Sequence, residues 1–420
     1  MAKGIAEGAV RIVAPLVSSS QGMSWKNAIE RLAREKTLPI FSDVALEFAQ
    51  QLSQRILQDK SLRIYPEIVS LGYWLRKSHL QEMKERCRAQ QGDDVRLPRG
   101  LVLAFAPGNI DTMFVYTWIL ALLAGNSGVV RISGRESEQV GVLLRLLNEL
   151  LSEERFVLVR QRSLFVQYDH DQTVTEWLSS LCHVRVIWGG DRSVRELRSI
   201  PLAPLATELV FPDRFGLAVL SAEAVLQSTA EQELQQLATN FYNDTLFFHQ
   251  LACSSPRLVC WLGAETIIID AKERFWKVFR SVIEQKQYKL APAIHMARLT
   301  QGFVQATLDH TVSVSAKDFT LPLCVTVDDF PAALREEHRG AGLFFEYHGQ
   351  RLEDILPLLA DKDQTITYFG VERSVWQSFC MNLRGRSVDR IVPVGQALDF
   401  SDIWDGYDLL MYFTRVVQIC

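Results

Sequence analysis

The chain lacks the features that mark membrane, secreted and nucleic-acid-binding proteins. Its 45 Lys and Arg residues are balanced by 49 Asp and Glu residues, whereas a dedicated nucleic-acid binder needs a basic excess to neutralise phosphates. The longest apolar run, residues 110–123, contains Asp111 and is shorter than the ~18–20 residues of a membrane span. No long apolar core lies near the N-terminus. We therefore expect a cytoplasmic protein with neither a secretory signal nor a transmembrane segment.

Paired cysteines and nucleotide-binding fingerprints are also missing. The 7 cysteines are an odd number, and they are scattered without a CxxC motif or a Cys/His cluster. We therefore expect neither a disulfide framework nor a metal site. The sequence contains no GxGxxG, GxxxxGK[ST], HExxH or GxSxG motif. Any nucleotide must consequently be bound in another way.

What the sequence does contain is enough apolar material for more than one domain. Its 420 residues are 48% hydrophobic, and a single core stops growing near ~250–300 residues. The first hundred residues are typical of helices, with apolar residues three or four apart in 25–34, 44–57 and 67–87. From residue 101 onward, short apolar runs alternate with amphipathic segments. This alternation predicts βαβ units and largely parallel sheets.

The alternation falls into two α/β lobes, residues 101–210 and 211–395. Strands are predicted at 101–106, 128–133, 164–168, 184–188, 216–221, 257–263, 364–370 and 389–395. Between them, long helices are predicted at 222–241 and 265–285. The tail ends in YDLLMYFTRVVQIC, which is too apolar to remain in water and must pack against another surface.

Residues 105–137, FAPGNIDTMFVYTWILALLAGNSGVVRISGRES, hold the first candidate site. A predicted strand ends at Ala106, and Pro107-Gly108-Asn109 turns the chain toward a helix. Asn109 therefore follows the carboxyl end of a parallel strand, where open α/β sheets bind ligands. Its amide could donate to an oxyanion, or it could simply cap the helix, and the residues alone leave both interpretations open.

Residues 247–263, FFHQLACSSPRLVCWLG, hold the second candidate. Cys253 lies between a long helix and the next strand, in a turn rich in Ser and Pro. A thiol on such a loop is accessible and can act as a nucleophile. The alternative is an inert buried thiol, which is our interpretation of the cysteines within apolar runs.

A glycine pair forms the third candidate. In VRVIWGGDRSVRELR, residues 184–198, a strand is followed by Gly189-Gly190 and then by a helix. Paired glycines let a ligand approach the backbone, and a helix N-terminus favours anions. The alternative is an ordinary tight turn.

In this order, the stretches resemble the aldehyde dehydrogenase superfamily and, within it, the LuxC-type long-chain acyl-CoA reductase family. PGN at 107–109 and LLAGNSGVVRIS at 122–133 carry the broader resemblance. The narrower one rests on motifs between residues 65 and 410: YPEIVSLGYWLRKSHL, FAPGNIDTMFVYTWILALLAGN, VIWGGDRSVRELR, FPDRFGLAVL, NDTLFFHQLACSSPR and DRIVPVGQALDFSDIWDGYDLL.

The resemblance implies an aldehyde dehydrogenase-like α/β fold with two open parallel-sheet lobes, a helical N-terminal segment and a small oligomerisation element. The implied domains are a helical segment packing on the cofactor lobe (1–100), an NADP-binding domain (101–210), a catalytic domain (211–395) and a bridging or oligomerisation tail (396–420). A homo-oligomer is therefore expected.

The activity implied by the resemblance is NADPH-dependent reduction of a fatty acyl thioester to the fatty aldehyde. Cys253 would be the nucleophile that carries the acyl group, and the Asn109 amide would bind the oxyanion. The acyl donor is open between acyl-CoA, a carrier protein and an acyl-protein synthetase partner. Luminescence is the best-known setting of this family.

Two departures from the superfamily pattern refine this expectation. Oxidising members carry Glu-Leu-Gly-Gly, whereas Glu208 here has no glycine pair after it, which favours thioester chemistry over hydrolysis. The cofactor strand reads RISGR at 131–135 in place of Lys-Pro-Ser-Glu, so it lacks the acid that would repel a 2′-phosphate. The predicted cofactor-binding residues are Arg131, Ser133, Arg135, Gly189 and Gly190.

Several alternatives stay open at this point. Either arginine of the cofactor strand could be a solvated charge at a strand end. The enzyme could instead be an NAD(P)-dependent aldehyde dehydrogenase that works oxidatively. A third alternative is an acyl-transfer protein that loads the cysteine without reducing the thioester.

Overall fold

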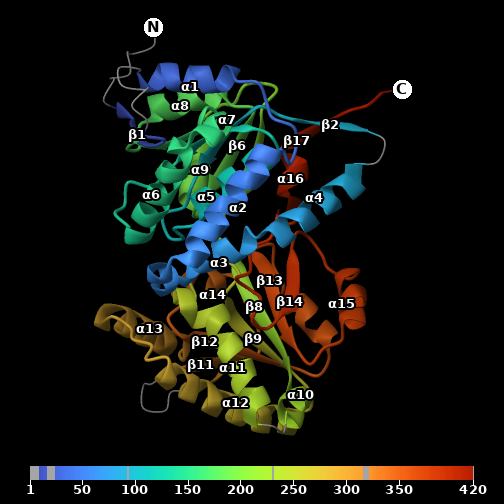
Figure 1. The fold of residues 1–420 in the computed structure, drawn as a ribbon. Coiled ribbons are helices and arrows are strands. Elements are labelled where there is room, and N and C mark those ends of the chain that lie inside the picture. Colours follow the sequence, from blue (N-terminus) through green and yellow to red (C-terminus); the bar gives the residue numbers. More distant parts are fainter. Residues whose placement is uncertain (1–8, 17–23, 92–93, 229–230, 316–320, 420) are drawn as a thin grey trace. The chain divides into compact units, whose positions relative to one another are not determined.

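A computed structural model describes residues 9–16, 24–91, 94–228, 231–315 and 321–419 (Figure 1). The chain divides into two compact units, Met1–Pro212 with Phe400–Cys420, and Asp213–Asp399. The chain thus leaves the first unit after Pro212 and returns to it after Asp399, close to the expected boundaries at 210 and 395. The helical N-terminal segment and the tail both belong to the first unit.

The first unit is built on a six-stranded sheet in the order β1-β5-β4-β3-β6-β7. Its strands are β1 (Arg11–Ala14), β3 (Leu101–Phe105), β4 (Ser127–Arg131), β5 (Ser163–Gln167), β6 (Val184–Trp188) and β7 (Thr207–Phe211). All neighbours are parallel except β1, which pairs antiparallel with β5 at one edge. All residues of β3 and β6 are buried, as expected for parallel strands covered on both faces.

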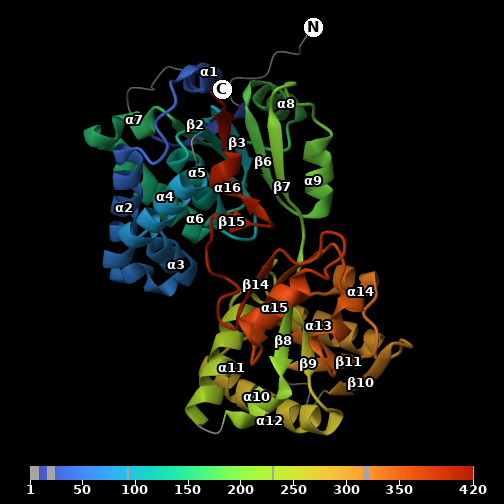
Figure 2. The same cartoon turned by 90° about the vertical axis from the view of Figure 1, so that its right-hand side faces the viewer.

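Helices cover both faces of this sheet (Figure 2). Apolar side chains of α1, α8 and α9 pack on one face, and those of α2 to α7 pack on the other. The elements are α1 (Trp25–Arg34), α2 (Asp43–Gln58), η3 (Lys60–Ile64), α3 (Pro66–Trp74), α4 (Lys77–Gln91), α5 (Met113–Leu123), α6 (Glu138–Ser152), η4 (Glu154–Phe156), α7 (Val157–Arg160), α8 (Gln172–Leu181) and α9 (Asp191–Arg198). Every residue of α5 is buried, because this helix lies between the sheet and the outer helices.

The C-terminal tail packs within this same unit. It contains the short ribbon of β15 (Ile403–Trp404) and β16 (Tyr407–Asp408), then α16 (Leu409–Tyr412) and β17 (Thr414–Val417). Leu409, Leu410 and Phe413 join the core formed by α2 to α7. β17 pairs antiparallel with β2 (Val95–Pro98). The first half of the tail is thus buried against its own chain, whereas Val416 and Ile419 further along are exposed.

The second unit contains a seven-stranded sheet in the order β10-β11-β12-β9-β8-β13-β14. Its strands are β8 (Phe215–Ser221), β9 (Pro256–Leu262), β10 (Thr311–Ser315), β11 (Leu323–Val327), β12 (Leu343–Gly349), β13 (Asp363–Phe369) and β14 (Arg390–Pro393). Only the edge strand β10 runs antiparallel to its neighbour.

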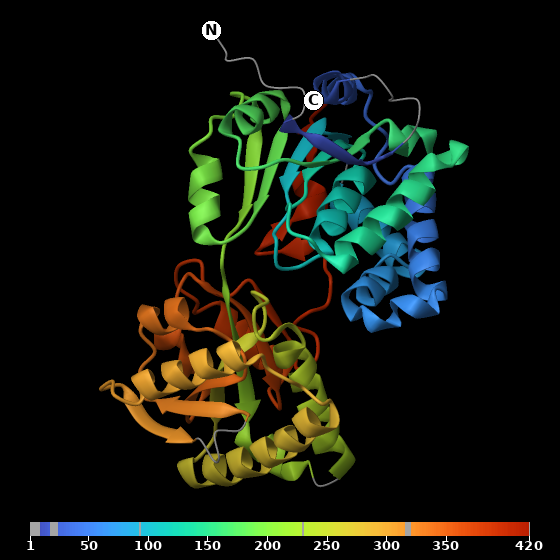
Figure 3. The ribbon, with the colours of Figure 1, turned by 90° about the vertical axis from the view of Figure 1, so that its left-hand side faces the viewer.

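Two helical layers enclose the second sheet (Figure 3). Its helices are α10 (Ala222–Gln227), α11 (Glu231–Thr245), η5 (Leu246–Phe248), α12 (Glu265–Gln285), α13 (Pro292–Gln305), α14 (Ala332–Glu337), η6 (Leu352–Leu358) and α15 (Arg373–Cys380). Side chains of α10, α11 and α12 form one core with the sheet, and those of α13 to α15 form another on the opposite face. In the described residues, no helix has the length and apolar composition needed to cross a membrane.

Two predicted helices are each divided in the structure. The predicted helix 67–87 is α3 and α4, separated by a turn in which Leu75 and Arg76 donate to the carbonyls of Leu71 and Tyr73. The predicted helix 222–241 is α10 followed by α11. Leu75 is fully buried, so apolar spacing continues through the turn and periodicity alone does not reveal the break.

Candidate active site

The strand order of the first unit reverses between β3 and β6. From β3 the chain moves to β4 and β5 on one side, and then crosses to β6 and β7 on the other. Ligands of open α/β sheets bind where the order reverses in this way. The loop with Asn109 follows β3, and Gly189-Gly190 follows β6. Two of the predicted segments therefore leave the sheet at its switch point.

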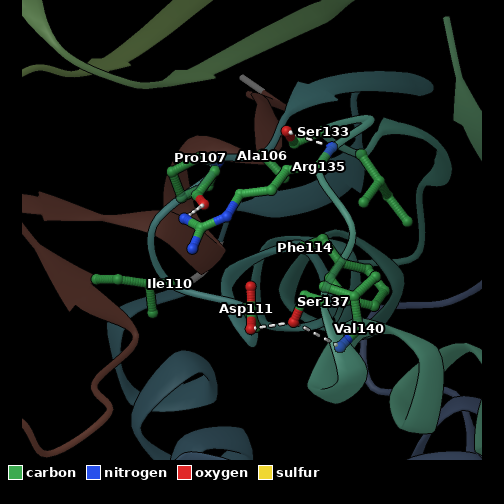
Figure 4. Close-up of a pocket in the computed structure, with 11 residues that line it drawn as sticks. Ala106, Pro107, Ile110, Asp111, Phe114, Ser133, Arg135, Ser137 and Val140 are labelled. Carbon is green, nitrogen blue, oxygen red and sulfur yellow. Dashed lines mark hydrogen bonds between the residues drawn. The ribbon is translucent and has the colours of Figure 1, made fainter. Parts of the chain in front are cut away.

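A pocket lies beside the loop that follows β3 (Figure 4). Its lining residues are Ala106, Pro107, Gly108, Ile110, Asp111, Phe114, Ile132, Ser133, Arg135, Ser137 and Val140. Ser133 and Arg135 therefore line the pocket, as do both neighbours of Asn109. The Asn109 side chain itself is exposed. The pocket thus joins the ends of β3 and β4 to the start of α6.

Arg135 connects the two loops of this pocket. Its guanidinium donates to the carbonyl of Gly108 at 3.2 Å, and its backbone N–H donates to the Ser133 hydroxyl at 3.3 Å (Figure 4). Beside it, a Cβ built on Gly134 would have no atom within 4 Å. A fixed cation next to open backbone suits an anionic group such as a phosphate.

An acidic pair lies next to this pocket. The Ser137 hydroxyl donates to the Asp111 carboxylate and also caps α6 by accepting from the backbone of Val140. Burial raises the pKa of Glu67 in α3 to about 7, and the charge of Asp111 adds to this effect, while a backbone hydrogen bond from Asp111 opposes it. The lining of the pocket therefore includes the carboxylate of Asp111, which already accepts a hydrogen bond from the Ser137 hydroxyl.

The remaining predicted cofactor residues flank the pocket. Arg131 donates to the carbonyl of Tyr168 at 3.2 Å, and its guanidinium lies 5.5 Å from the centre of that ring. Gly189 donates to the carbonyl of Phe211, and Gly190 precedes the first turn of α9 with open space at its Cβ position. These residues lie at the same sheet edge but do not line this pocket.

Glu208, the residue considered as a base for hydrolysis, is held in ion pairs. It lies on β7, where its carboxylate accepts from Arg185 and, at 3.1 Å, from Arg198. Two guanidinium groups hold this carboxylate in a fixed position. This arrangement fits a structural ion pair.

Cys253 lies in the second unit, in the turn between η5 and β9. Its side chain is partly exposed. The two residues that start this segment, His249 and Gln250, have left-handed backbones with φ of 54° and 59°. Such conformations are costly for side chains other than glycine and persist only where surrounding contacts impose them.

Gln250 supplies such contacts. Its side chain is fully buried, and its amide donates to the carbonyls of Pro256 at 3.0 Å and Leu343 at 3.2 Å. Its oxygen accepts from the backbone of Gly342 at 2.6 Å. Gln250 therefore ties both ends of the Cys253 loop to β9 and to the loop before β12. Sequence reasoning missed this role, although a glutamine within an apolar stretch signals a buried polar contact.

Arg257, four residues after Cys253, also holds the loop through hydrogen bonds to backbone carbonyls. Its guanidinium donates to the carbonyls of Gln250 at 3.0 Å, Ala252 at 3.3 Å and Arg214 at 3.3 Å. The loop also presses closely on β8, since a Cβ on Gly216 would come within 2.6 Å of the Ser254 carbonyl oxygen. Only glycine fits at this contact.

The other thiols have different surroundings. The six described cysteines form no disulfide. Burial raises the pKa of the five described thiols other than Cys253, namely Cys87, Cys182, Cys260, Cys324 and Cys380. For Cys182 it raises the pKa to about 12. Such thiols remain protonated near neutral pH and are weak nucleophiles.

Two further features concern proton and metal chemistry. The Nδ1 atom of His249 lies 2.6 Å from the Tyr288 hydroxyl, and partial loss of solvent around the ring lowers the pKa of this histidine. Within the described ranges, no group of three or more His, Cys, Asp or Glu residues is arranged to hold a metal ion.

A family model named acyl-CoA reductase (LuxC) matches residues 46–290, more than half of the 420 residues. The chain belongs to the LuxC acyl-CoA reductase family. The match includes the Asn109 loop, the cofactor strand and the Cys253 loop of this LuxC family member. Family and fold together support an oxidoreductase that acts on acyl or aldehyde groups with a nicotinamide cofactor.

Solved aldehyde dehydrogenases share the fold of this LuxC family member. A lactaldehyde dehydrogenase is 13% identical with a TM-score of 0.64, covering 93% of this chain and 90% of its own. A betaine aldehyde dehydrogenase variant from Staphylococcus aureus is 11% identical with a TM-score of 0.65, covering 93% and 86%. An aldehyde dehydrogenase from Bacillus cereus, in complex with NAD+, is 10% identical with a TM-score of 0.62, covering 93% and 88%. No curated protein sequence matches the chain significantly.

Proposed function

We propose that the protein reduces a fatty acyl thioester to the fatty aldehyde with NADPH, through an acyl group carried on Cys253. The observation that carries this proposal is the distinct setting of that thiol. Four of the other described cysteines are buried, and the exposed Cys380 lies outside the family match, whereas Cys253 is partly exposed on a hydrogen-bonded loop within the match. The donor would be a fatty acyl-CoA or an acyl group on a protein.

The proposed reaction begins when the Cys253 sulfur attacks the carbonyl carbon of the thioester. The carbonyl oxygen becomes an oxyanion, which would accept hydrogen bonds from the Asn109 amide and the Cys253 backbone N–H. The bond to the donor sulfur then breaks, and the acyl group remains on Cys253. NADPH, when bound, supplies a hydride to the acyl carbon. Breakage of the carbon–Sγ bond then releases the aldehyde and restores the Cys253 thiolate.

The cofactor would be held at the switch point of the first sheet. Ser133, Arg135 and the backbone around Gly134 fit a phosphate-bearing ribose, because they combine a guanidinium, a hydroxyl and open space. Arg131, Gly189 and Gly190 would flank it. Asp111 is neighboured by the Ser137 hydroxyl, which lessens its repulsion of a phosphate. These features favour NADPH over NADH.

An oxidative aldehyde dehydrogenase is the second candidate, and the named function of the neighbouring structures favours it. It would need a base that activates water against the acyl-Cys253 thioester. Glu208 is poorly suited because two guanidinium groups hold its carboxylate. Without such a base, transfer to a thiol should outpace hydrolysis.

One experiment distinguishes these candidates. The protein is incubated with tetradecanoyl-CoA and NADPH, and loss of NADPH absorbance and formation of aldehyde are followed, with Cys253→Ala as the control. The proposal expects aldehyde and NADPH loss in equal amounts from the parent alone. Release of fatty acid without NADPH loss would favour a hydrolytic enzyme, and stable acylation without either product would favour an acyl-transfer protein.

A further inference from the structure

Arg257 is a buried cation without an acidic partner. Its side chain is buried, with 6% of the residue exposed. Among the described residues, no carboxylate forms an ion pair with it. Its hydrogen bonds all go to the neutral carbonyls of Gln250, Ala252 and Arg214. A buried charge that lacks a counter-charge is strongly unfavourable, so its position requires a reason.

Four other buried arginines are paired differently. Each of these four forms an ion pair with a carboxylate: Arg162 with Glu35, Arg185 with Glu208, Arg214 with Asp389 and Arg335 with Asp363. Arg335 is the closest comparison, because both it and Arg257 lie over the ring of Phe215, at 5.7 Å and 5.3 Å. The fold thus supplies an acid to one of these two neighbours and leaves the other unpaired.

The charges that act on Arg257 include Cys253. Burial lowers the pKa of the Arg257 guanidinium, while Asp213 and Cys253 raise it. Electrostatic coupling is reciprocal, so the interaction that favours the guanidinium favours the thiolate equally. Asp213 makes the larger of these two contributions, and it also pairs with Lys362 at 3.2 Å. The Cys253 thiolate would be a second anion that Arg257 compensates, on the loop whose Ala252 carbonyl the guanidinium binds at 3.3 Å.

The other ionisable groups near Arg257 do not supply a competing charge. His338 is buried, and burial together with Arg257 lowers its pKa to about 3, so it is neutral near pH 7. Arg214 is neutralised by Asp389 at 2.6 Å. His249, at the start of the Cys253 loop, is turned to the Tyr288 hydroxyl.

We propose that Arg257 is a positioning residue that favours the thiolate of Cys253 through space and fixes its loop through the Ala252 carbonyl. This inference rests on the proposed role of Cys253 as nucleophile. The positive charge would stabilise the attacking thiolate and, later in the reaction, the thiolate that leaves when the aldehyde is released. The three hydrogen bonds from the guanidinium to backbone carbonyls would hold the loop, and with it the sulfur, in place. The charge of Arg257 and its hydrogen bonds are therefore two contributions that different substitutions can separate.

The test measures the rate at which iodoacetamide alkylates Cys253 between pH 5 and 10, with the modified residue identified by mass spectrometry. Alkylation needs neither cofactor nor substrate, so it reports on the thiolate alone. The midpoint is the pH at which a thiol reaches half of its maximal alkylation rate. In the parent, we expect the midpoint of Cys253 to lie at least about one pH unit below that of the exposed Cys380 in the same molecule. Equal midpoints for the two thiols would overturn the proposal.

Variants then separate charge from geometry. Arg257→Met should raise the midpoint by about one unit or more and slow alkylation at pH 7 roughly tenfold, with the plateau rate at high pH unchanged. Arg257→Lys should keep the midpoint near that of the parent while turnover falls, because the ammonium retains the charge but not the three carbonyl bonds. Should Arg257→Met fail to fold, Arg257→Gln carries the same test.

Two outcomes identify what has failed. If removing the charge lowers the melting temperature but leaves the midpoint unchanged, Arg257 is only structural and the inference is wrong. If the midpoint shifts as expected while Cys253→Ala retains reductase activity, the thiolate pairing stands and the proposed function fails.

Discussion

The two loops that carry the proposed reaction chemistry are built in contrasting ways. The Asn109 loop follows the carboxyl end of β3, exposes the Asn109 side chain and borders a small pocket through its neighbours Gly108 and Ile110. The Cys253 loop precedes the amino end of β9 and is fixed by the buried side chains of Gln250 and Arg257. The Asn109 side chain is therefore little constrained by its surroundings, whereas buried polar contacts hold the Cys253 loop in place.

This contrast predicts how substitutions should act. Around Asn109, few contacts within the protein are lost when a side chain changes, so activity should fall without loss of stability. Around Cys253, buried polar groups would lose their partners, so stability and activity should fall together.

The largest effect is expected at the nucleophile itself. Cys253→Ala should reduce aldehyde formation by roughly a thousandfold or more, because the acyl group loses its covalent carrier. Cys380→Ala is the matched control, since this thiol is exposed and lies outside the proposed site. Aldehyde formation from tetradecanoyl-CoA measures both. A Cys253→Ala variant that turns over like the parent would exclude acyl-Cys253 as the intermediate.

The next effect concerns the open loop. Asn109→Ala should lower kcat by about 10²–10³, the usual cost of losing one oxyanion donor. The exposed side chain makes no contact that would stabilise the fold, so the melting temperature should stay within about 1 °C of the parent value. Steady-state kinetics and thermal unfolding check the two parts. A large drop in melting temperature would show that Asn109 is a structural cap instead.

The rigid loop should respond differently. Gln250→Ala removes three buried hydrogen bonds and leaves the Pro256 and Leu343 carbonyls and the Gly342 N–H without this partner. We expect a loss of about 3 kcal/mol in the free energy of unfolding of the second unit, together with reduced turnover. Urea denaturation followed by tryptophan fluorescence measures the stability. If Gln250→Ala lost activity as Asn109→Ala does, at unchanged stability, the contrast between the loops would not hold.

These loops also show what the sequence could and could not predict. The βαβ order, the helices 25–34 and 265–285 and the family were predictable, because each is encoded by local periodicity or contiguous motifs. The helix breaks at Leu75 and between α10 and α11 were missed, because apolar spacing passes through them. The strands β10 to β12 were also missed, since their place in the sheet depends on distant pairing with β9.

Within the candidate site, sequence motifs identified Ser133 and Arg135, which share one pocket, but not the contacts that hold the cysteine loop. Gln250 and Arg257 lie inside the quoted motif, yet their roles come from bonds to carbonyls distant in the chain, such as those of Leu343 and Arg214. Backbone acceptors carry no sequence signature. Buried polar side chains beside a proposed nucleophile are therefore the positions at which structure adds most.

A smaller effect is expected at the cofactor pocket. Arg135→Glu should raise the KM for NADPH by about tenfold or more, and the KM for NADH should change little, because the proposed function pairs this cation with the 2′-phosphate that NADH lacks. Arg192→Glu is a suitable control, as this arginine is exposed on α9 and pairs with Glu196 at 3.0 Å. Initial rates with each cofactor provide the measurement. Equal loss with both cofactors would assign Arg135 to general loop structure.

The smallest expected effect is a change in stability when one buried carboxyl group in each unit is replaced. Burial raises the pKa of Glu67 to about 7 in the first unit and that of Asp244 to about 7 in the second. The Asp244 carboxylate accepts from the backbones of Gly395 and Ala397, at 2.6 and 3.0 Å. In Glu67, by contrast, one carboxylate oxygen is buried without a partner. The two acids should therefore respond differently to neutral amide replacements.

The sign follows from proton linkage. A carboxyl with a pKa near 4.5 in the unfolded chain and about 7 in the folded chain binds a proton more tightly when folded, so stability falls as pH rises across that interval. Glu67→Gln removes this loss and should make the first unit more stable than the parent at pH 8, by on the order of 1–2 kcal/mol, with little difference near pH 4.5. The same linkage acts on Asp244, but Asp244→Asn also replaces a carboxylate that serves two N–H donors with an amide that has a single acceptor oxygen. Asp244→Asn should therefore gain less stability at pH 8 than Glu67→Gln, and urea unfolding at pH 5 and pH 8 measures both changes. A destabilised Glu67→Gln variant would mean that Glu67 is ionised and paired in the folded protein.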